Sequence, residues 1–218
     1  MKSEFWLARW ERQEIGFHQD EINPYLIQYQ DCLCLTDNAE VFVPMCGKTR
    51  DMIWLREQRC KVLGVELSDI AARDFFTEND LLPQSTSTQH FEILAADDIR
   101  LLCGDYFALS RNELENVTAV FDRASLVALP VDMRERYAMH MVSILAPGAK
   151  ILLVAFDYPQ SEMTGPPFAV SPDEVEALYG RHADISLLDT HDVLEQNPPF
   201  KGRGLSQLHE HIFLLTIR

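Results

Sequence analysis

A glycine turn and an acid that ends a later strand are the residues of this chain best placed to do chemistry. Residues 41–48 read Val-Phe-Val-Pro-Met-Cys-Gly-Lys, and Glu66 closes the later apolar run Val-Leu-Gly-Val. Gly47 lets the backbone approach a ligand closely, and a carboxylate at a strand end can accept hydrogen bonds from both hydroxyls of a ribose. The pair predicts a nucleoside-binding site. The alternative is an ordinary turn glycine and a solvated acid.

The turn favours a nucleoside over a dinucleotide. It lacks the Gly-x-Gly-x-x-Gly pattern, and Pro44 removes one backbone donor beside it. A single glycine makes a poor cradle for a pyrophosphate, whereas a nucleoside whose other half is uncharged or cationic needs no such cradle. S-adenosylmethionine meets that description.

The elements around the turn and the acid form one βαβ unit. Residues 41–45 are a short, β-branched run, which predicts a strand that the glycine turn ends. Residues 51–58 carry apolar side chains at helical spacing, and residues 61–65 form a second strand-like run. Because such units cross over right-handedly, the turn and the acid come together at the carboxyl edge of the sheet.

The rest of the chain continues this alternation of strands and helices. Residues 82–89, with proline and alternating serine and threonine, are expected to form a surface loop or an insertion. The pattern predicts an α/β fold, with a mostly parallel sheet flanked by helices on both faces, in one domain over residues 1–218. The expected strands are residues 91–95, 99–103, 118–121, 150–156, 184–193 and 211–217, and the expected helices are residues 131–145 and one that Ser171 caps.

Residues 1–38 do not share this alternation and precede an α/β core at residues 39–218. They are rich in aromatic residues and are expected to form an amphipathic helix followed by a looser segment. Such a segment could be a lid that covers a flat ligand and excludes water. Alternatively, two aromatic residues four apart simply pack the helix on the sheet. The aromatic residues are Phe5, Trp6, Trp10, Phe17, Tyr25 and Tyr29.

Composition narrows the class of partner. A net charge of −15 over 218 residues argues against nucleic acid or an anionic membrane and favours small-molecule chemistry. No apolar run has the length of a membrane span, and the N-terminus lacks the uncharged core of a signal peptide, so we expect a cytoplasmic protein. The five cysteines include no Cys-x-x-Cys pattern, which predicts free thiols.

Two further features could do chemistry: Cys46 as a nucleophile, and the run His209-Glu210-His211 as a metal site. Cys46 has no base next to it in the sequence, so we favour a packing role over a nucleophilic one. The two histidines would share one face of a strand. Two ligands without a third make a weak metal site, and we expect no bound metal.

Five spaced blocks resemble the thiopurine S-methyltransferase family, in its bacterial form, and the resemblance covers nearly the whole chain. The blocks are Trp6 to Trp10 followed by Phe17-His18, residues 42–48, residues 64–68 (Gly-Val-Glu-Leu-Ser), residues 122–129 (Asp-Arg-Ala-Ser-Leu-Val-Ala-Leu) and residues 165–168 (Gly-Pro-Pro-Phe). The resemblance implies a class I methyltransferase fold, S-adenosylmethionine as cofactor and the sulfur of an aromatic or heterocyclic thiol as methyl acceptor. It also implies that the cofactor site is lined by Trp10, Phe17, Met45, Gly47, Glu66, Gly104, Asp105 and Arg123.

Asp122 and Arg123 are the expected catalytic pair. A methyl group on a sulfonium needs only a soft nucleophile in line, and a heterocyclic thiol is substantially ionised near neutral pH, so positioning and desolvation carry the rate. Arginine cannot act as a base at neutral pH. Arg123 is therefore expected to steer the thiolate or a ring nitrogen, with Asp122 orienting it. The alternative is a surface ion pair of little energetic value.

The chain departs from the family pattern in two places. Met45 stands where leucine is usual, and the arginine expected near Pro199 in bacterial relatives is missing, which leaves Lys201 or Arg203 to replace it. Two other functions stay open. The same fold could methylate a halide, hydrosulfide, or a selenium or tellurium species, with a role in their detoxification, or the chain could sense the nucleoside without catalysis. We expect a monomer.

Overall fold

The computed structural model describes residues 3–218 and divides into two compact units, the first ending at Phe121 and the second beginning at Asp122. Met1 and Lys2, which begin the expected N-terminal segment, lie outside the described residues. Among the described residues, no helix combines the length and the apolar character needed to cross a membrane.

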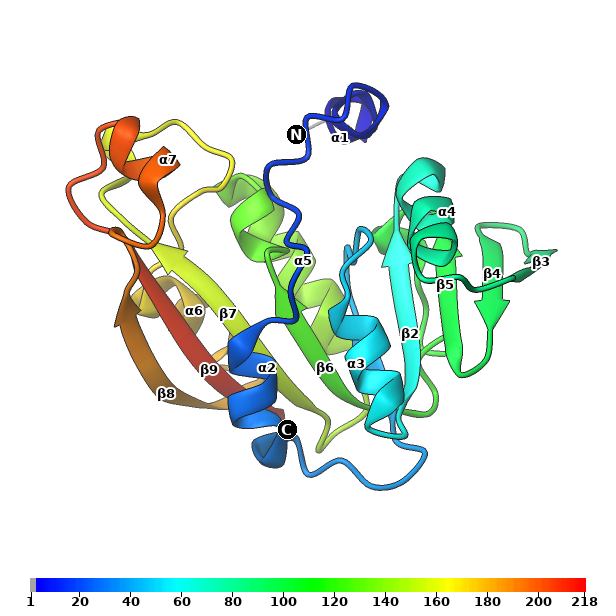
Figure 1. Ribbon diagram of the computed structural model, residues 1–218. Helices are drawn as coiled ribbons and strands as arrows, with labels where there is room; N and C mark the ends of the chain where they lie inside the picture. The colour runs from blue at the N-terminus through cyan, green and yellow to red at the C-terminus, as the bar shows by residue number, and fades with distance from the viewer. Residues whose placement is uncertain (1–2) are drawn as a thin grey trace. The chain divides into compact units, whose positions relative to one another are not determined.

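The first unit has a parallel core with an antiparallel edge. Its strands lie in the order β3-β4-β5-β2-β1-β6 (Figure 1). Strand β1 pairs in parallel with β2 and β6, and β2 pairs in parallel with β5, whereas β4 runs antiparallel to both β5 and β3. The strands are β1 (Glu40–Val43), β2 (Lys61–Glu66), β3 (Gln84–Ser87), β4 (Glu92–Ala96), β5 (Ile99–Cys103) and β6 (Val117–Arg123), the last of which continues into the second unit.

Two helices of this unit, α2 and α4, begin at side-chain caps that the sequence encodes. Asn23 Oδ1 accepts the backbone N–H of Tyr25 at 3.0 Å, and Ser68 Oγ accepts that of Ala71 at 3.3 Å, so α2 and α4 both start at favourable caps. Helix α4, which the sequence patterns did not single out, packs against β2 and β5. The elements are α1 (Ser3–Glu11), α2 (Pro24–Tyr29), α3 (Asp51–Glu57), α4 (Asp69–Glu78) and the 3₁₀ turns η1 (Gln30–Leu33) and η2 (Tyr106–Ala108).

The segment 82–89 corrects the expectation of a surface loop, because it contains β3. All four residues of β3 are exposed, and they pair antiparallel with β4. An edge strand made of serine, threonine and glutamine has no apolar face, so it shows no hydrophobic alternation in the sequence. Its pairing with the more apolar β4 decides its structure.

The second unit has an antiparallel sheet in which β9 lies between β7 and β8 (Figure 1). Helix α5 buries Tyr137, Met141 and Ile144, as the helical spacing predicted, and packs against α6. The elements are η3 (Leu126–Ala128), α5 (Val131–Ile144), β7 (Lys150–Asp157), η4 (Gln160–Glu162), α6 (Pro172–Tyr179), β8 (Ala183–Asp192), α7 (Pro198–Gly202) and β9 (His209–Ile217).

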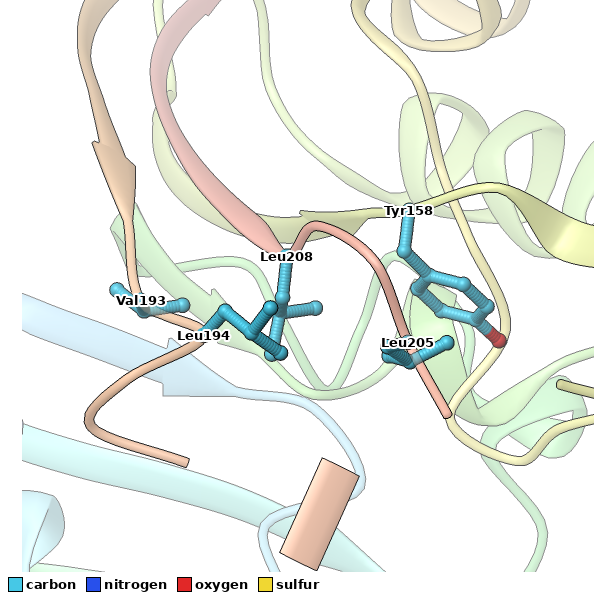
Figure 2. Packing of buried hydrophobic residues seen from close by; sticks show 5 residues of the cluster. All are labelled: Tyr158, Val193, Leu194, Leu205 and Leu208. Carbon is cyan, nitrogen blue, oxygen red and sulfur yellow. The ribbon is translucent and has the colours of Figure 1, made fainter. Parts of the chain in front are cut away.

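A cluster of five buried apolar side chains lies where β7 and β8 end and β9 begins. We call these residues the Tyr158 cluster, and Figure 2 shows the ring of Tyr158 beside Leu205 and the side chains of Val193 and Leu194 beside Leu208. The cluster helps to anchor the segment that carries α7, since a five-residue helix has little stability of its own. Its members are Tyr158, Val193, Leu194, Leu205 and Leu208.

The start of α6 gives a prediction about stability. Ser171 Oγ accepts the backbone N–H of Glu174 at 3.2 Å, so Ser171→Ala should lower the free energy of unfolding by about 1 kcal/mol, the usual value of such a cap. Urea unfolding measures the change, with the exposed Ser161→Ala as the matched control. A loss no larger than that of the control would contradict the capping role.

Candidate active site

Glu66 lies at the centre of the candidate site in the first unit. Its Oε2 accepts the backbone N–H of Gly47 at 2.8 Å, and its Oε1 accepts that of Ser68 at 2.8 Å. The side chain is only 7% exposed. The parallel pairing of β1 and β2 therefore brings the glycine turn and the acid into direct contact, as the sequence predicted.

The environment of Glu66 suits a neutral polyol partner. Burial raises the pKa of the carboxyl group, while the hydrogen bonds from Ser68, Gly47 and Leu67 lower it. A carboxylate offers about four lone-pair sites, so even with these donors it can still accept a hydrogen bond from a ligand. Such an acceptor fits the hydroxyls of a ribose, whereas it would repel a phosphate at this position. The residues present thus fit the nucleoside half of S-adenosylmethionine.

The glycine turn is held in a left-handed conformation that fixes where its N–H groups point. Met45 has φ of 45° and Gly47 has φ of 53°. The backbone N–H of Cys46 donates to the carbonyl of Val65 at 3.0 Å, which ties the turn to β2. Met45 itself is half-buried. Such a conformation is cheap for glycine and costly for most other residues, so Gly47 is the residue that the turn needs.

Trp10 packs on this turn from the N-terminal segment. A Cβ built on Gly47 would lie 3.2 Å from Trp10 Cζ2, so the indole covers the face of the glycine, and Trp10 is 3% exposed. Phe17 contacts Trp10 edge-to-face at 5.5 Å between ring centroids and is itself 37% exposed. The structure thus brings Trp10, Phe17 and Gly47 together.

Gly104 and Asp105 follow β5 and adjoin Glu66 through the backbone. The N–H of Gly104 donates to the main-chain carbonyl of Glu66 at 2.8 Å. A Cβ on Gly104 would lie 2.8 Å from the carbonyl oxygen of His90, so no larger residue fits there without a shift. Asp105 is exposed, and its Oδ1 accepts the N–H of Phe107 at 2.9 Å.

The structure adds supports for the turn that the sequence patterns missed. Lys48 is 9% exposed and donates from Nζ to Glu78 Oε1 at 2.6 Å. Asp51, which is 2% exposed, accepts the N–H of Asn23 at 2.7 Å and the hydroxyl of Thr49 at 2.7 Å. The carboxylate of Asp51 therefore links the turn to the start of α2. The sequence shows Asp51 only as an acid in the first turn of a helix, because its partner Asn23 lies 28 residues away.

Asp122 and Arg123 end β6 and belong to the second unit. Arg123 is half-buried, and Ala124 follows it with φ of 67°, which turns the chain sharply at the strand end. Asp122 is 1% exposed and accepts the hydroxyl of Tyr137 at 2.7 Å. Burial raises the pKa of Asp122 to about 6, against the opposite effect of hydrogen bonds from Tyr137 and Ser125. Asp122 is therefore an internal support, unlike a member of an exposed ion pair.

Lys201 and Arg203, the two candidates to replace the missing arginine, both have side-chain partners near α7. Lys201 Nζ lies 2.6 Å from Glu195 Oε1. The guanidinium of Arg203 lies over the ring of Phe200, and its Nη1 is 3.8 Å from Met163 Sδ. Of the two, Arg203 has the contacts that lead toward the Tyr158 cluster, because Phe200 and Met163 pack against it.

Cysteine and histidine chemistry contribute little to this site. All five cysteines are free, and burial raises the pKa of the Cys46 thiol well above its usual range, which suits packing and opposes nucleophilic use. His211 contacts Thr190 Oγ1 through Nδ1 at 2.9 Å and Asp157 Oδ2 through Nε2 at 3.4 Å. Residues 3–218 contain no group of three or more side chains placed to hold a metal ion.

A hollow of ≈ 600 Å³ elsewhere in the first unit is a poor candidate site. It is lined by residues around the start of β3 and the end of β4, including Ala96. Ala96 pairs with Ile99, the first residue of β5, whereas Glu66 pairs with Cys103, the last. The hollow therefore lies at the amino edge of the parallel strands, and ligands of such sheets bind at the carboxyl edge.

Comparisons with known proteins agree with the geometry. The family model for thiopurine S-methyltransferase matches residues 1–218. A thiopurine S-methyltransferase of Nitrosospira multiformis is 57% identical over 218 residues, covering 100% of this chain and 99% of the relative. The corresponding protein of Azotobacter vinelandii is 46% identical, with 100% of both chains covered.

A solved structure supports the fold. An S-adenosylmethionine-dependent methyltransferase of Anabaena variabilis superposes with a TM-score of 0.66 at 11% identity, over 99% of this chain and 95% of that one. The expected class I methyltransferase fold is thus confirmed. With the family match over the whole chain, the cofactor is S-adenosylmethionine, and the chain belongs to the thiopurine S-methyltransferase family.

Proposed function

We propose that this methyltransferase transfers the methyl group of S-adenosylmethionine to the sulfur of a small aromatic or heterocyclic thiol. The names of its relatives support the acceptor class. The observation that carries the donor half is the buried carboxylate of Glu66, which joins the left-handed glycine turn to the end of β2.

The first unit supplies the groups proposed to bind the donor. Glu66 accepts the ribose hydroxyls, and the turn at Met45 and Gly47 offers backbone close to the ligand. Gly104 and Asp105 extend the same edge from β5. Trp10 and Phe17 cover the site and exclude water, which strengthens each polar contact made inside it.

The second unit supplies the groups proposed to bind the acceptor. The donor, when bound, supplies a methyl group that a soft nucleophile can attack. Arg123 holds a permanent positive charge at the end of β6, which favours the thiolate form of the acceptor and orients it. Asp122 acts through its buried contact with Tyr137 to fix that strand end. Arg203 is the proposed further cation on the acceptor side.

The other chemistries fit less well. Methylation of halide, hydrosulfide, selenium or tellurium species, and a part in their detoxification, need no aromatic cover and draw no support from the relatives' names. The cytoplasmic location and the monomeric state stay predictions from the sequence. A panel of thiols, halides and selenium oxyanions, incubated with donor labelled in its methyl group, tests the acceptor class. Labelling of the inorganic acceptors alone would contradict the proposal.

Glu66→Ala should weaken binding of S-adenosylmethionine by about 1.5–3 kcal/mol, the range for hydrogen bonds to a charged group. Calorimetric titration measures the dissociation constant, and Glu57→Ala, an exposed acid at the end of α3, is the matched control. A folded Glu66→Ala variant with the parental dissociation constant would remove Glu66 from the donor site.

Arg123→Lys should keep part of the activity and Arg123→Ala should lose most of it, because lysine preserves the charge but lacks the planar fork of donors. Steady-state kinetics with a heterocyclic thiol measure the effect, with melting curves to show that each variant is folded and the exposed Arg181→Ala as control. If Arg123 forms only a surface pair, worth at most about 1 kcal/mol, all three variants should stay within a few-fold of the parent.

The N-terminal segment should gain protection from amide exchange when the demethylated donor is bound, since lids belong to the least stable parts of a fold. Hydrogen exchange on α1 and on the residues up to Phe17 measures this, with α4 as the internal reference. Equal protection with and without ligand would show instead that Trp10 is a permanent part of the core.

A further inference from the structure

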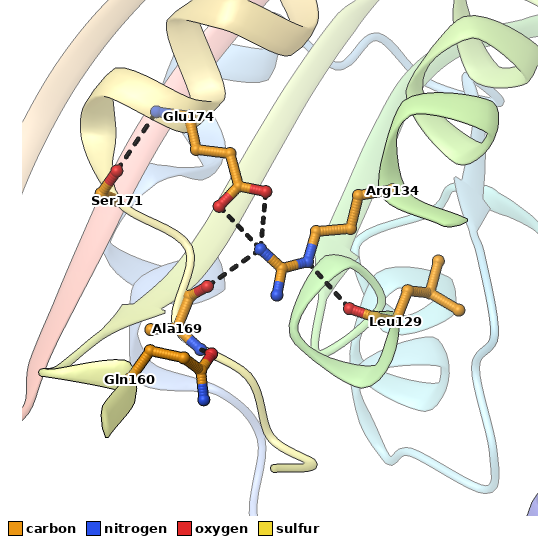
Figure 3. Close-up of polar contacts among 6 residues, drawn as sticks. All are labelled: Leu129, Arg134, Gln160, Ala169, Ser171 and Glu174. Carbon is orange, nitrogen blue, oxygen red and sulfur yellow. Dashed lines mark hydrogen bonds and ion pairs between the residues drawn. The ribbon is translucent and has the colours of Figure 1, made fainter. Parts of the chain in front are cut away.

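Arg134 is a buried charge in the second unit that the proposed chemistry does not yet use. It lies on α5 and is 1% exposed. Its Nη1 lies 2.6 Å from each carboxylate oxygen of Glu174, which balances the charge inside the fold (Figure 3). Burying an arginine is costly unless its charge and donors are matched, so its remaining contacts indicate what the arrangement achieves.

These contacts join two loops that follow different strands. Arg134 Nε donates to the carbonyl of Leu129 at 2.8 Å, and Nη1 donates to that of Ala169 at 2.9 Å (Figure 3). Leu129 ends the turn that begins at Arg123, after β6, and Ala169 belongs to the loop after β7. One guanidinium therefore bridges the two loops. Its Nη2 is buried and has no hydrogen-bond partner among the described residues, so the arrangement does not satisfy every donor of the Arg134 side chain.

The loop after β7 is held by hydrogen bonds to its backbone at residues 167–169. The hydroxyl of Tyr158 donates to the carbonyl of Pro167 at 2.6 Å, and the N–H of Ala169 donates to Gln160 Oε1 at 2.9 Å. The N–H of Phe168 donates to the carbonyl of Val127 at 2.6 Å, which lies in the turn that follows Arg123. The loop and the turn thus form one hydrogen-bonded unit, and Arg134 is bonded to both.

The same face of α5 also holds the strand end. Tyr137 lies one turn after Arg134 and donates its hydroxyl to Asp122, the neighbour of Arg123. Residues three apart on a helix lie on the same face. Arg134 and Tyr137 together therefore fix the chain on both sides of Arg123, at Asp122 and at Leu129.

We propose that Arg134 is a positioning residue for the methyl acceptor. It sets the distance between the turn that carries Arg123 and the loop that carries Phe168, and so determines how tightly the acceptor is held. The inference rests on the proposed function, in which Arg123 contacts the acceptor. It assigns no contact between Arg134 and either substrate.

The role depends on the shape of the side chain as well as on its charge. A lysine at position 134 keeps the pairing with Glu174, but its single ammonium cannot reproduce the two directions in which Nε and Nη1 donate. One of the two loops then loses its hold while the buried charge remains balanced. Arg134→Lys is therefore the informative variant, since removing the charge altogether would leave Glu174 unpaired and threaten folding.

The test compares Arg134→Lys with a second variant that loosens the same loop from another side. Gln160→Ala removes the acceptor of the Ala169 N–H, and its exposed position makes it tolerable for folding. The exposed Arg181→Lys is the matched control. The measurements are KM for a heterocyclic thiol, kcat, the calorimetric dissociation constant of the demethylated donor, and the melting temperature.

Both loop variants should raise KM for the thiol by about fivefold or more, while the dissociation constant of the demethylated donor stays within about twofold. The control should match the parent. A folded Arg134→Lys variant with parental KM, or one that weakens thiol and donor alike, would overturn the inference and leave the proposed function standing. A parent enzyme that binds donor but methylates no thiol would overturn the proposed function, and this inference with it.

Discussion

The buried carboxylate of Glu66 is the constraint on which the first unit depends. An ionised acid can be buried only if hydrogen bonds replace the water it loses. Here the N–H groups of Gly47 and Ser68 provide them, and both point at the acid because of where β2 ends. The left-handed turn, the cap of α4 that Ser68 forms, and the path of the chain after β1 all meet at this one side chain.

This constraint explains why the sequence was informative around the proposed donor site. The β1-turn-α3-β2 unit is local, so the short β-branched run, the glycine and the strand-end acid predict their own arrangement. The helices at Ser171 and over residues 131–145 were likewise predicted from caps and spacing, and the structure confirms both. The parallel core and the family could be predicted for the same reason, because their signals lie within short segments, and both predictions are confirmed.

The parts that the sequence did not predict depend on partners far along the chain. Asp51 looks like an ordinary acid in the first turn of a helix until Asn23 is brought beside it. Arg134 lies on the buried face of α5 with Tyr137 and Met141. A charged residue among apolar positions of a helix was the one sequence feature that could have indicated a buried ion pair. The partners of Arg134 lie up to 40 residues away, so no local pattern could identify them. Strand β3 was missed because an edge strand without an apolar face has no alternation to read.

The loop after β7 is held through its backbone, and this has a consequence for how the family can diverge. The contacts with Tyr158, Gln160 and Arg134 reach main-chain groups of Pro167 and Ala169, which every residue type except proline retains in full. These hydrogen bonds do not depend on the side chains at positions 168 and 169, although both side chains pack inside the fold, Phe168 against Arg134 and Ala169 against the Tyr158 cluster. Substitution at these positions would therefore change how the loop packs while leaving in place the main-chain hydrogen bonds that hold it.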